Sequence, residues 1–206
     1  SLSVENRLQG SIFSTFLTFG VIIKNRLFMS YVGIQSFLLG SMFAYIAASP
    51  FIFQSFYGLS AFIFSLCFGA NGAALVIGAN IGGKLPNRQA LAIGVFAFVV
   101  AALYTIAVLI IQPYWLFIEI GFFAMLLLMG ITFPAISSLA MESERQYAGS
   151  ASALLGFAPF FLGGVVSPLV GIGNIFYSTS FVILICALLA LSIYWMIRHK
   201  IPTSAE

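Results

Sequence analysis

Glu119 is the acidic residue that lies inside a long apolar stretch, and its position makes it the first residue to consider for chemistry. It stands about one and a half helical turns, roughly 8 Å, from the start of the stretch that begins near Tyr114. A carboxylate in hydrocarbon is costly unless it is paired, protonated or exposed to water, so a functional role is the default hypothesis. We therefore predict that Glu119 is a proton carrier. The alternative is that its side chain reaches the outer interface or an aqueous vestibule.

A second group of residues could bind a ligand because its members recur at four- and three-residue intervals and so share one helical face. Two phenols, an amide, a thioether and a leucine would give a broad apolar site some hydrogen-bonding capacity. These residues are Tyr31, Gln35, Leu38, Met42 and Tyr45. The alternative is a face that packs against neighbouring helices. Asn71, in the middle of the next apolar stretch, either lines a cavity or joins two helices by a hydrogen bond.

Small residues are spaced for close helix contact in two of the apolar stretches. The second stretch carries a four-residue stripe of Ala70, Ala74, Gly78 and Gly82, which lets another helix approach closely. The fifth stretch contains Gly156 and Gly164 on a similar ladder, together with prolines that permit kinks. We predict that these residues form helix interfaces.

The sequence contains no recognisable catalytic motif. The sequence contains no Asp and a single His, His199, so an Asp-based triad and a cluster of His and acid ligands are excluded. No glycine-rich loop ends in Lys-Ser or Lys-Thr to hold a phosphate. Cys67 and Cys186 lie in apolar runs, which is typical of packed thiols rather than of a disulfide or a metal site. The sequence predicts a protein that is not an enzyme and has neither cofactor nor metal.

Long apolar helices must position these residues. The 206-residue chain is 62% hydrophobic and 6% charged, so it cannot form the polar coat of a soluble enzyme or a nucleic-acid-binding protein. A transmembrane helix needs roughly 20 apolar residues. Six stretches meet that length, and they are Leu27–Ala48, Ser60–Gly83, Gln89–Ile111, Tyr114–Ala140, Tyr147–Val170 and Ile175–Ile197. We expect Ser49-Pro50 to end the first.

The predicted fold is therefore an all-α membrane protein with six transmembrane helices in one domain, residues 26–200. Residues 1–25 are predicted to be a linker in which residues 8–23 form an amphipathic interfacial helix, and residues 201–206 a tail. Every Lys and Arg falls in alternate breaks between the spans, namely Arg7, Lys24, Arg26, Lys84, Arg88, Arg145, Arg198 and Lys200. By the positive-inside rule these breaks, the linker and the tail are cytoplasmic.

Two parts of the sequence carry a family resemblance. The stretch Met42–Ser60, MFAYIAASPFIFQSFYGLS, with Phe68-Gly-Ala-Asn71 after it, resembles spans seven and eight of drug:proton antiporters of the major facilitator superfamily. The nearest type is the bicyclomycin/chloramphenicol-resistance group. Phe133-Pro134 and the run AGSASA at 148–153 are similar to the region of spans ten and eleven. The resemblance covers nearly the whole chain, but only the C-terminal half of such a transporter.

This resemblance implies two inverted three-helix repeats, formed by spans one to three and spans four to six. It implies that spans one and four line a central cavity, spans two and five meet the other half, and spans three and six face lipid. It also implies export of small amphipathic substrates against proton entry, by alternating access, in a bacterial inner membrane. Phe122 and Met129 on span four then join the residues of span one and Asn71 as candidate substrate-binding residues.

The sequence departs from the family in two respects. The loop after Gly78 keeps the glycines and Lys84 of the superfamily's cytoplasmic motif but lacks its acid. The family's principal proton-carrying acids lie in the N-terminal half, so we expect a missing N-terminal half or a second copy as partner, besides protons and membrane lipids. Nucleic acid is not an expected partner. The alternatives are half of a small-solute uptake symporter, or a non-transporting membrane subunit that self-associates.

Overall fold

The computed structural model describes residues 19–201, and this part of the chain contains six helices long and apolar enough to cross a membrane and no strand. This confirms the predicted all-α membrane fold, although most of the amphipathic helix predicted over residues 8–23 lies outside the described residues. The elements are α2 (Arg26–Pro50), η2 (Phe51–Phe56), α3 (Ala61–Gly82), α4 (Asn87–Ile111), α5 (Trp115–Ser143), η3 (Arg145–Tyr147), α6 (Ala148–Val166), η4 (Ser167–Gly171) and α7 (Ile175–Ile197).

The first span does not end at Ser49-Pro50, so that prediction was wrong. Pro50 has helical torsion angles, and the chain continues from it as the π-helix η2. Proline cannot donate to the carbonyl four residues earlier, which is that of Ile46. The Ser49 hydroxyl donates to this carbonyl instead, at 3.4 Å, and the wider π turn then carries the chain to Phe56.

Short polar residues fix the ends of several helices. The side chain of Asn25 accepts hydrogen bonds from the first backbone N–H groups of α2, and Asn174 does the same for α7. Ser60 caps α3 by accepting from Ile63 N at 3.3 Å. Gln112 ends α4 in the left-handed conformation, with φ of 54°, and thereby turns the chain sharply into α5. These caps hold the connections short, so consecutive spans run antiparallel.

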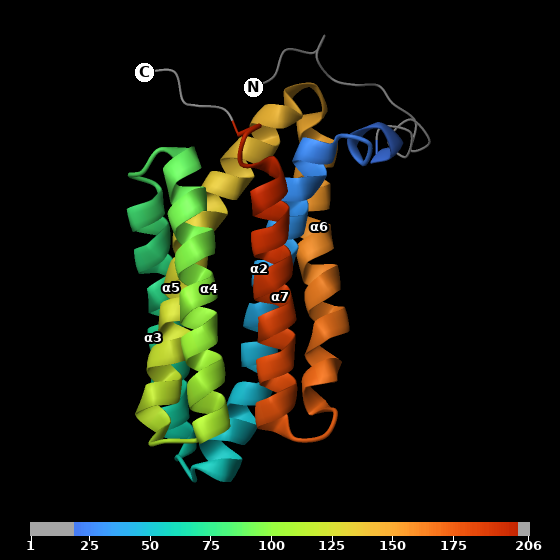
Figure 1. Ribbon diagram of the computed structural model, residues 1–206. Helices are drawn as coiled ribbons and strands as arrows, with labels where there is room; N and C mark the ends of the chain where they lie inside the picture. The colour runs from blue at the N-terminus through green and yellow to red at the C-terminus, as the bar shows by residue number, and fades with distance from the viewer. Residues whose placement is uncertain (1–18, 202–206) are drawn as a thin grey trace.

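The packing of the six helices is that of two inverted repeats that exchange their partners. In Figure 1, α3, α4 and α5 lie together on one side of the bundle, and α2, α6 and α7 on the other. Thus α5, of the second repeat, packs against α3 and α4 of the first repeat, and α2, of the first repeat, packs against α6 and α7 of the second. Contacts between α2 and α5 and between α4 and α7 join the two sides. The pattern is preserved when α2–α4 and α5–α7 are interchanged, as inverted repeats require.

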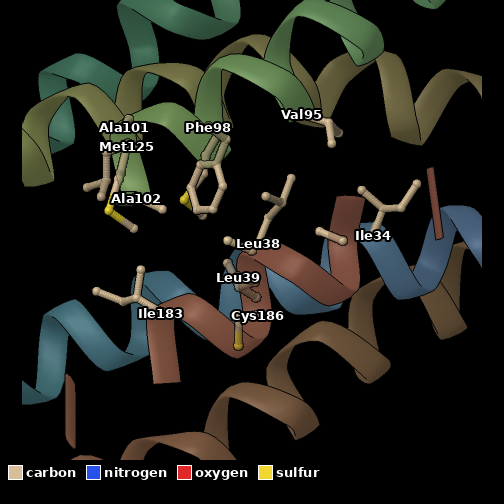
Figure 2. Packing of buried hydrophobic residues seen from close by; sticks show 14 of the residues in the cluster. Ile34, Leu38, Leu39, Val95, Phe98, Ala101, Ala102, Met125, Ile183 and Cys186 are labelled. Atoms are coloured by element: carbon tan, nitrogen blue, oxygen red, sulfur yellow. The ribbon is translucent and has the colours of Figure 1, made fainter. Parts of the chain in front are cut away.

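Burial follows from this arrangement. The spans built on α2 and α5 are the most buried, and α3 and α6 are the least buried. The apolar core lies between the two sides, where Figure 2 shows Ile34 and Leu38 of α2 near Val95 and Phe98 of α4. The central position of α2 and α5 means that polar side chains on them are enclosed by neighbouring helices.

Close packing of α4 on α5 depends on two glycine–threonine contacts. Gly94 of α4 lies against Thr132 of α5, and Gly121 of α5 lies against Thr105 of α4. A Cβ atom at either glycine would overlap the facing threonine side chain. Both threonine hydroxyls bond to carbonyls of their own helices, Thr105 to Ala101 and Thr132 to Leu128, so no hydroxyl is left unpaired. The two helices are therefore held in one register.

Basic charge is confined to one end of the bundle. The Lys and Arg side chains of residues 19–201 belong to the start of α2, the α3–α4 connection with the first turn of α4, the α5–α6 connection and the segment after α7. These four segments lie together at the top of Figure 1. The three opposite connections carry no base. Which end faces the cytoplasm stays a prediction.

Candidate functional site

Glu119 lies in the second turn of α5, near the end of the bundle that has no bases. Its side chain is 7% exposed, and neither carboxyl oxygen has a hydrogen-bond partner among the described residues. The Lys and Arg side chains of this part of the chain all lie at the opposite end, so Glu119 has no counter-ion there. An ionised carboxylate is costly in such surroundings, and its negative charge must be neutralised by a proton or a cation.

Two further helices bring polar groups to Glu119. Asn71 of α3 is fully buried, and its Nδ2 donates to the hydroxyl of Tyr45 on α2 at 3.0 Å. The Asn71 amide also lies within hydrogen-bonding reach of the Glu119 carboxyl, although no bond of normal geometry is formed. Cys67, one turn before Asn71 on α3, lies within electrostatic range of Glu119. Three helices thus place an acid, an amide and a phenol together.

Aromatic rings enclose these polar groups. The ring of Tyr45 lies 4.8 Å from that of Phe122 and 5.8 Å from that of Phe68, between centroids. Phe53 of η2 lies 6.3 Å from Phe122. Since Phe53 belongs to the π turn, the continuation of the helix past Pro50 supplies one wall of the enclosure. We call Glu119, Asn71, Tyr45, Cys67, Phe68 and Phe122 the Glu119 cluster.

The other candidate substrate-binding residues lie outside this cluster. Tyr31 and Tyr45 are roughly 21 Å apart along α2 at 1.5 Å per residue. Tyr31 is fully buried near the basic end, within electrostatic range of Glu142, and its hydroxyl has no partner among the described residues. Of the remaining four, Leu38 and Met129 are fully buried between helices, whereas Gln35 and Met42 are half-buried. A substrate-binding role for these residues stays a prediction.

The small-residue stripe of α3 packs against α5. Gly78 and Gly82 lie on the α5 backbone between Leu127 and Ile131, and Gly130 of α5 lies reciprocally on the backbone of α3. Ala74 is fully buried, while Ala70 is exposed. On α6 both predicted interface residues, Gly156 and Gly164, are exposed and have no neighbour near the Cβ position. For the three exposed residues, Ala70, Gly156 and Gly164, contact with the other half of a transporter stays a prediction.

Two structural residues escaped the sequence analysis. The close contact of α6 is made by Gly163, on the ring of Phe43 of α2, and nothing in the spacing distinguishes Gly163 from Gly164. At the basic end, Glu144 is 6% exposed and accepts a hydrogen bond from the Asn25 side chain that caps α2. The sequence placed Glu144 in a polar connection. Its burial depends on the position of α2, which spacing does not reveal.

A separate hollow of about 640 Å³ opens at the end of the bundle that has no bases. Its walls come from η2, the α4–α5 turn and the α6–α7 connection, including Phe51, Phe56, Gln112 and Asn174. None of the candidate substrate-binding residues lines it. The polar groups of the Glu119 cluster are therefore not part of this hollow.

Comparison with known proteins defines the class. The chain is 37% identical over 178 residues to the MFS-type transporter YdgK of Bacillus subtilis, and the match covers 84% of this chain and 44% of that protein. It is 26% identical over 179 residues to a bicyclomycin resistance protein homolog of Haemophilus influenzae, covering 81% of this chain and 43% of that protein. No family model matches the chain.

Both matches fall in the C-terminal half of the relative, and the chain spans less than half the length of these curated relatives. The class of protein that the six spans and these matches define is a multi-pass membrane protein that is similar to one half of a transporter. The chain matches the C-terminal half of major facilitator superfamily transporters, and its six helices form one half of that fold.

Proposed function

We propose that this chain is the C-terminal half of a proton-coupled exporter of small amphipathic compounds. In this proposal it works by alternating access in a bacterial inner membrane, with both termini in the cytoplasm. The observation that carries the proposal is Glu119, a buried carboxyl at the meeting point of α2, α3 and α5 that has no counter-ion among residues 19–201. A proton taken up and released there changes the charge within the bundle, and such intramembrane acids serve as proton relays.

The Glu119 cluster also supports a preference for amphipathic substrates. Its rings, Tyr45, Phe68 and Phe122, offer apolar surface beside hydrogen-bonding groups, which is the composition of small-molecule sites. A substrate and a proton that compete for the same cluster would exchange, which is the basis of antiport. Along α2 and α5 the proposed substrate path includes the remaining candidates Tyr31, Gln35, Leu38, Met42 and Met129. The name of one relative, a bicyclomycin resistance protein homolog, is consistent with drug export.

A second six-helix half is the partner that the proposal requires. The least buried helices, α3 and α6, expose large apolar side chains, among them Phe62 and Leu66 on α3 and Phe157 and Phe161 on α6. In the proposal these faces meet the other half and the surrounding lipid. The complete transporter then encloses the substrate path between two halves.

The test is proton-driven transport in proteoliposomes that contain this chain together with the N-terminal half of a close relative. We expect an imposed pH gradient to drive export of a fluorescent amphipathic dye. Glu119→Gln should abolish the coupling, because the amide cannot exchange a proton. Glu142→Gln is the matched control, since Glu142 is exposed and paired with Arg145 at 3.0 Å. Unchanged coupling in Glu119→Gln, or robust transport by this chain alone, would contradict the proposal.

A further inference from the structure

The Glu119 cluster contains three buried acceptor oxygens that have no hydrogen bond within the described part of the chain. Two are the carboxyl oxygens of Glu119, and the third is Oδ1 of Asn71. The Nδ2 group of Asn71 is directed to α2, where it donates to the Tyr45 hydroxyl at 3.0 Å. This bond uses one of the two Nδ2 hydrogens, so both the second hydrogen and the unpartnered carbonyl Oδ1 of Asn71 remain for α5. Three buried acceptors without a partner lie together, and a further hydrogen on one of them would allow a bond between Glu119 and Oδ1 of Asn71.

We propose that a proton on Glu119 supplies the missing donor. The protonated carboxyl donates to Oδ1 of Asn71, and this bond completes a chain of hydrogen bonds from Glu119 through Asn71 to Tyr45. The chain joins α5, α3 and α2. This inference rests on the proposed proton-carrying role of Glu119. It assigns Asn71 and Tyr45 as positioning residues, whose hydrogen bonds couple the protonation of Glu119 to the positions of α3 and α2.

Loss of the proton reverses this arrangement. When the proton leaves Glu119 for water, the carboxylate can only accept, so its bond to Oδ1 is broken. The negative charge then repels Oδ1 and attracts Nδ2, which draws the amide away from Tyr45. A single proton thus controls one hydrogen bond between α5 and α3 and a second between α3 and α2. Such a change in interhelical bonds gives α2 and α5 two distinct arrangements, as alternating access requires.

The neighbours of Glu119 leave this role to Asn71. The titratable groups nearest to it are Tyr45 on α2 and Cys67 on α3. On α4, the Tyr104 hydroxyl donates to the carbonyl of Phe117 at 3.3 Å and is thereby occupied. The basic side chains of the described range lie at the other end of the bundle. Within this range, the amide of Asn71 is the polar group that lies close enough to form a hydrogen bond with the Glu119 carboxyl.

Infrared difference spectroscopy tests the inference on the full chain in lipid nanodiscs. A change of pH should produce the carbonyl band of a protonated carboxyl, and loss of this band in Glu119→Gln assigns it to Glu119. In Asn71→Leu the band should shift to higher wavenumber, because the protonated carboxyl has lost its acceptor. Tyr45→Phe keeps the ring and removes the partner that holds the amide, so we expect a smaller shift in the same direction.

The matched control is Asn80→Leu, which changes the same residue type on the same helix. Asn80 is exposed and its side chain donates to the Val76 carbonyl at 2.8 Å, so the band should not move. An unchanged band in both Asn71→Leu and Tyr45→Phe overturns the inference, and Tyr45→Phe decides alone if Asn71→Leu does not fold. If the band shifts in Asn71→Leu but transport proves not to be coupled to protons, the proposed function is refuted while the chain of hydrogen bonds is retained.

Discussion

Replacing Gly78 by alanine tests the contact on which the position of α3 depends. The α carbon of Gly78 lies on the α5 backbone, and a Cβ atom there would overlap the Leu127 carbonyl and approach Gly130 Cα and Ile131 N to 3.0 Å. All these atoms belong to the backbone, so no side chain can rotate away. The two helices must therefore separate, and the packing of Asn71 and Cys67 on the same helix would be disturbed with them.

The magnitude follows from two opposing effects. Overpacking of a close contact costs typically about 1–3 kcal/mol. Alanine is a better helix former than glycine by about 1 kcal/mol in water, which offsets part of the loss. We expect a net destabilisation of about 0–2 kcal/mol. Gly72 on the same helix has no atom within 4 Å of its Cβ position, so Gly72→Ala should be neutral or slightly stabilising.

Thermal unfolding in detergent, followed by circular dichroism, measures the difference between the two variants. For a protein of this size each kcal/mol corresponds to a change in Tm of about 2–4 °C. Gly78→Ala should melt below the parent chain by up to several degrees, and Gly72→Ala at or above it, so that Gly78→Ala melts below Gly72→Ala. Equal melting temperatures for the two variants would show that α3 does not approach α5 as closely as described.

Three further outcomes are expected. Asn25→Ala removes both the cap of α2 and the donor to buried Glu144, so it should lower stability by about 1–2 kcal/mol in denaturant unfolding. Ser49→Ala leaves the carbonyl freed by proline without its donor, and a loss of about 1 kcal/mol should appear in the same assay. Burial raises the pKa of Tyr57, which lies beyond η2 and donates to the Pro113 carbonyl at 2.6 Å. Its phenol should therefore ionise at higher pH than free tyrosine by ultraviolet absorbance, and its contribution to stability should be lost as the pH rises above about 10.

The sequence predicts the number of helices and their approximate limits because length and hydropathy alone decide them. A helix such as α7, with Asn174 before it, needs no tertiary information to be located. Pro50 shows where this approach fails. Proline normally ends a helix, but a serine hydroxyl replaces the missing donor and a π turn absorbs the change in register. Local compensation of this kind is not visible in propensities.

The candidate site was predicted in part. Glu119 stands out because an acid in an apolar run is rare, whatever the fold around it. Helical spacing treats Tyr31 and Tyr45 as equivalent members of one face, yet only Tyr45 reaches Asn71. The difference arises from where α3 crosses α2, which depends on the packing of both helices against α5. Neighbours across helices are a property of the bundle and cannot be read from one span.

The exchange of partners between the two repeats has a consequence for biosynthesis. When α2, α3 and α4 have left the ribosome, the helices that they pack against are still untranslated. These are α6 and α7 for α2, and α5 for α3 and α4. The early helices must therefore wait in the lipid as single inserted segments. Assembly is complete only after α7 has been synthesised, so a chain that stops short of this helix would leave α2 uncovered and open to quality-control proteolysis.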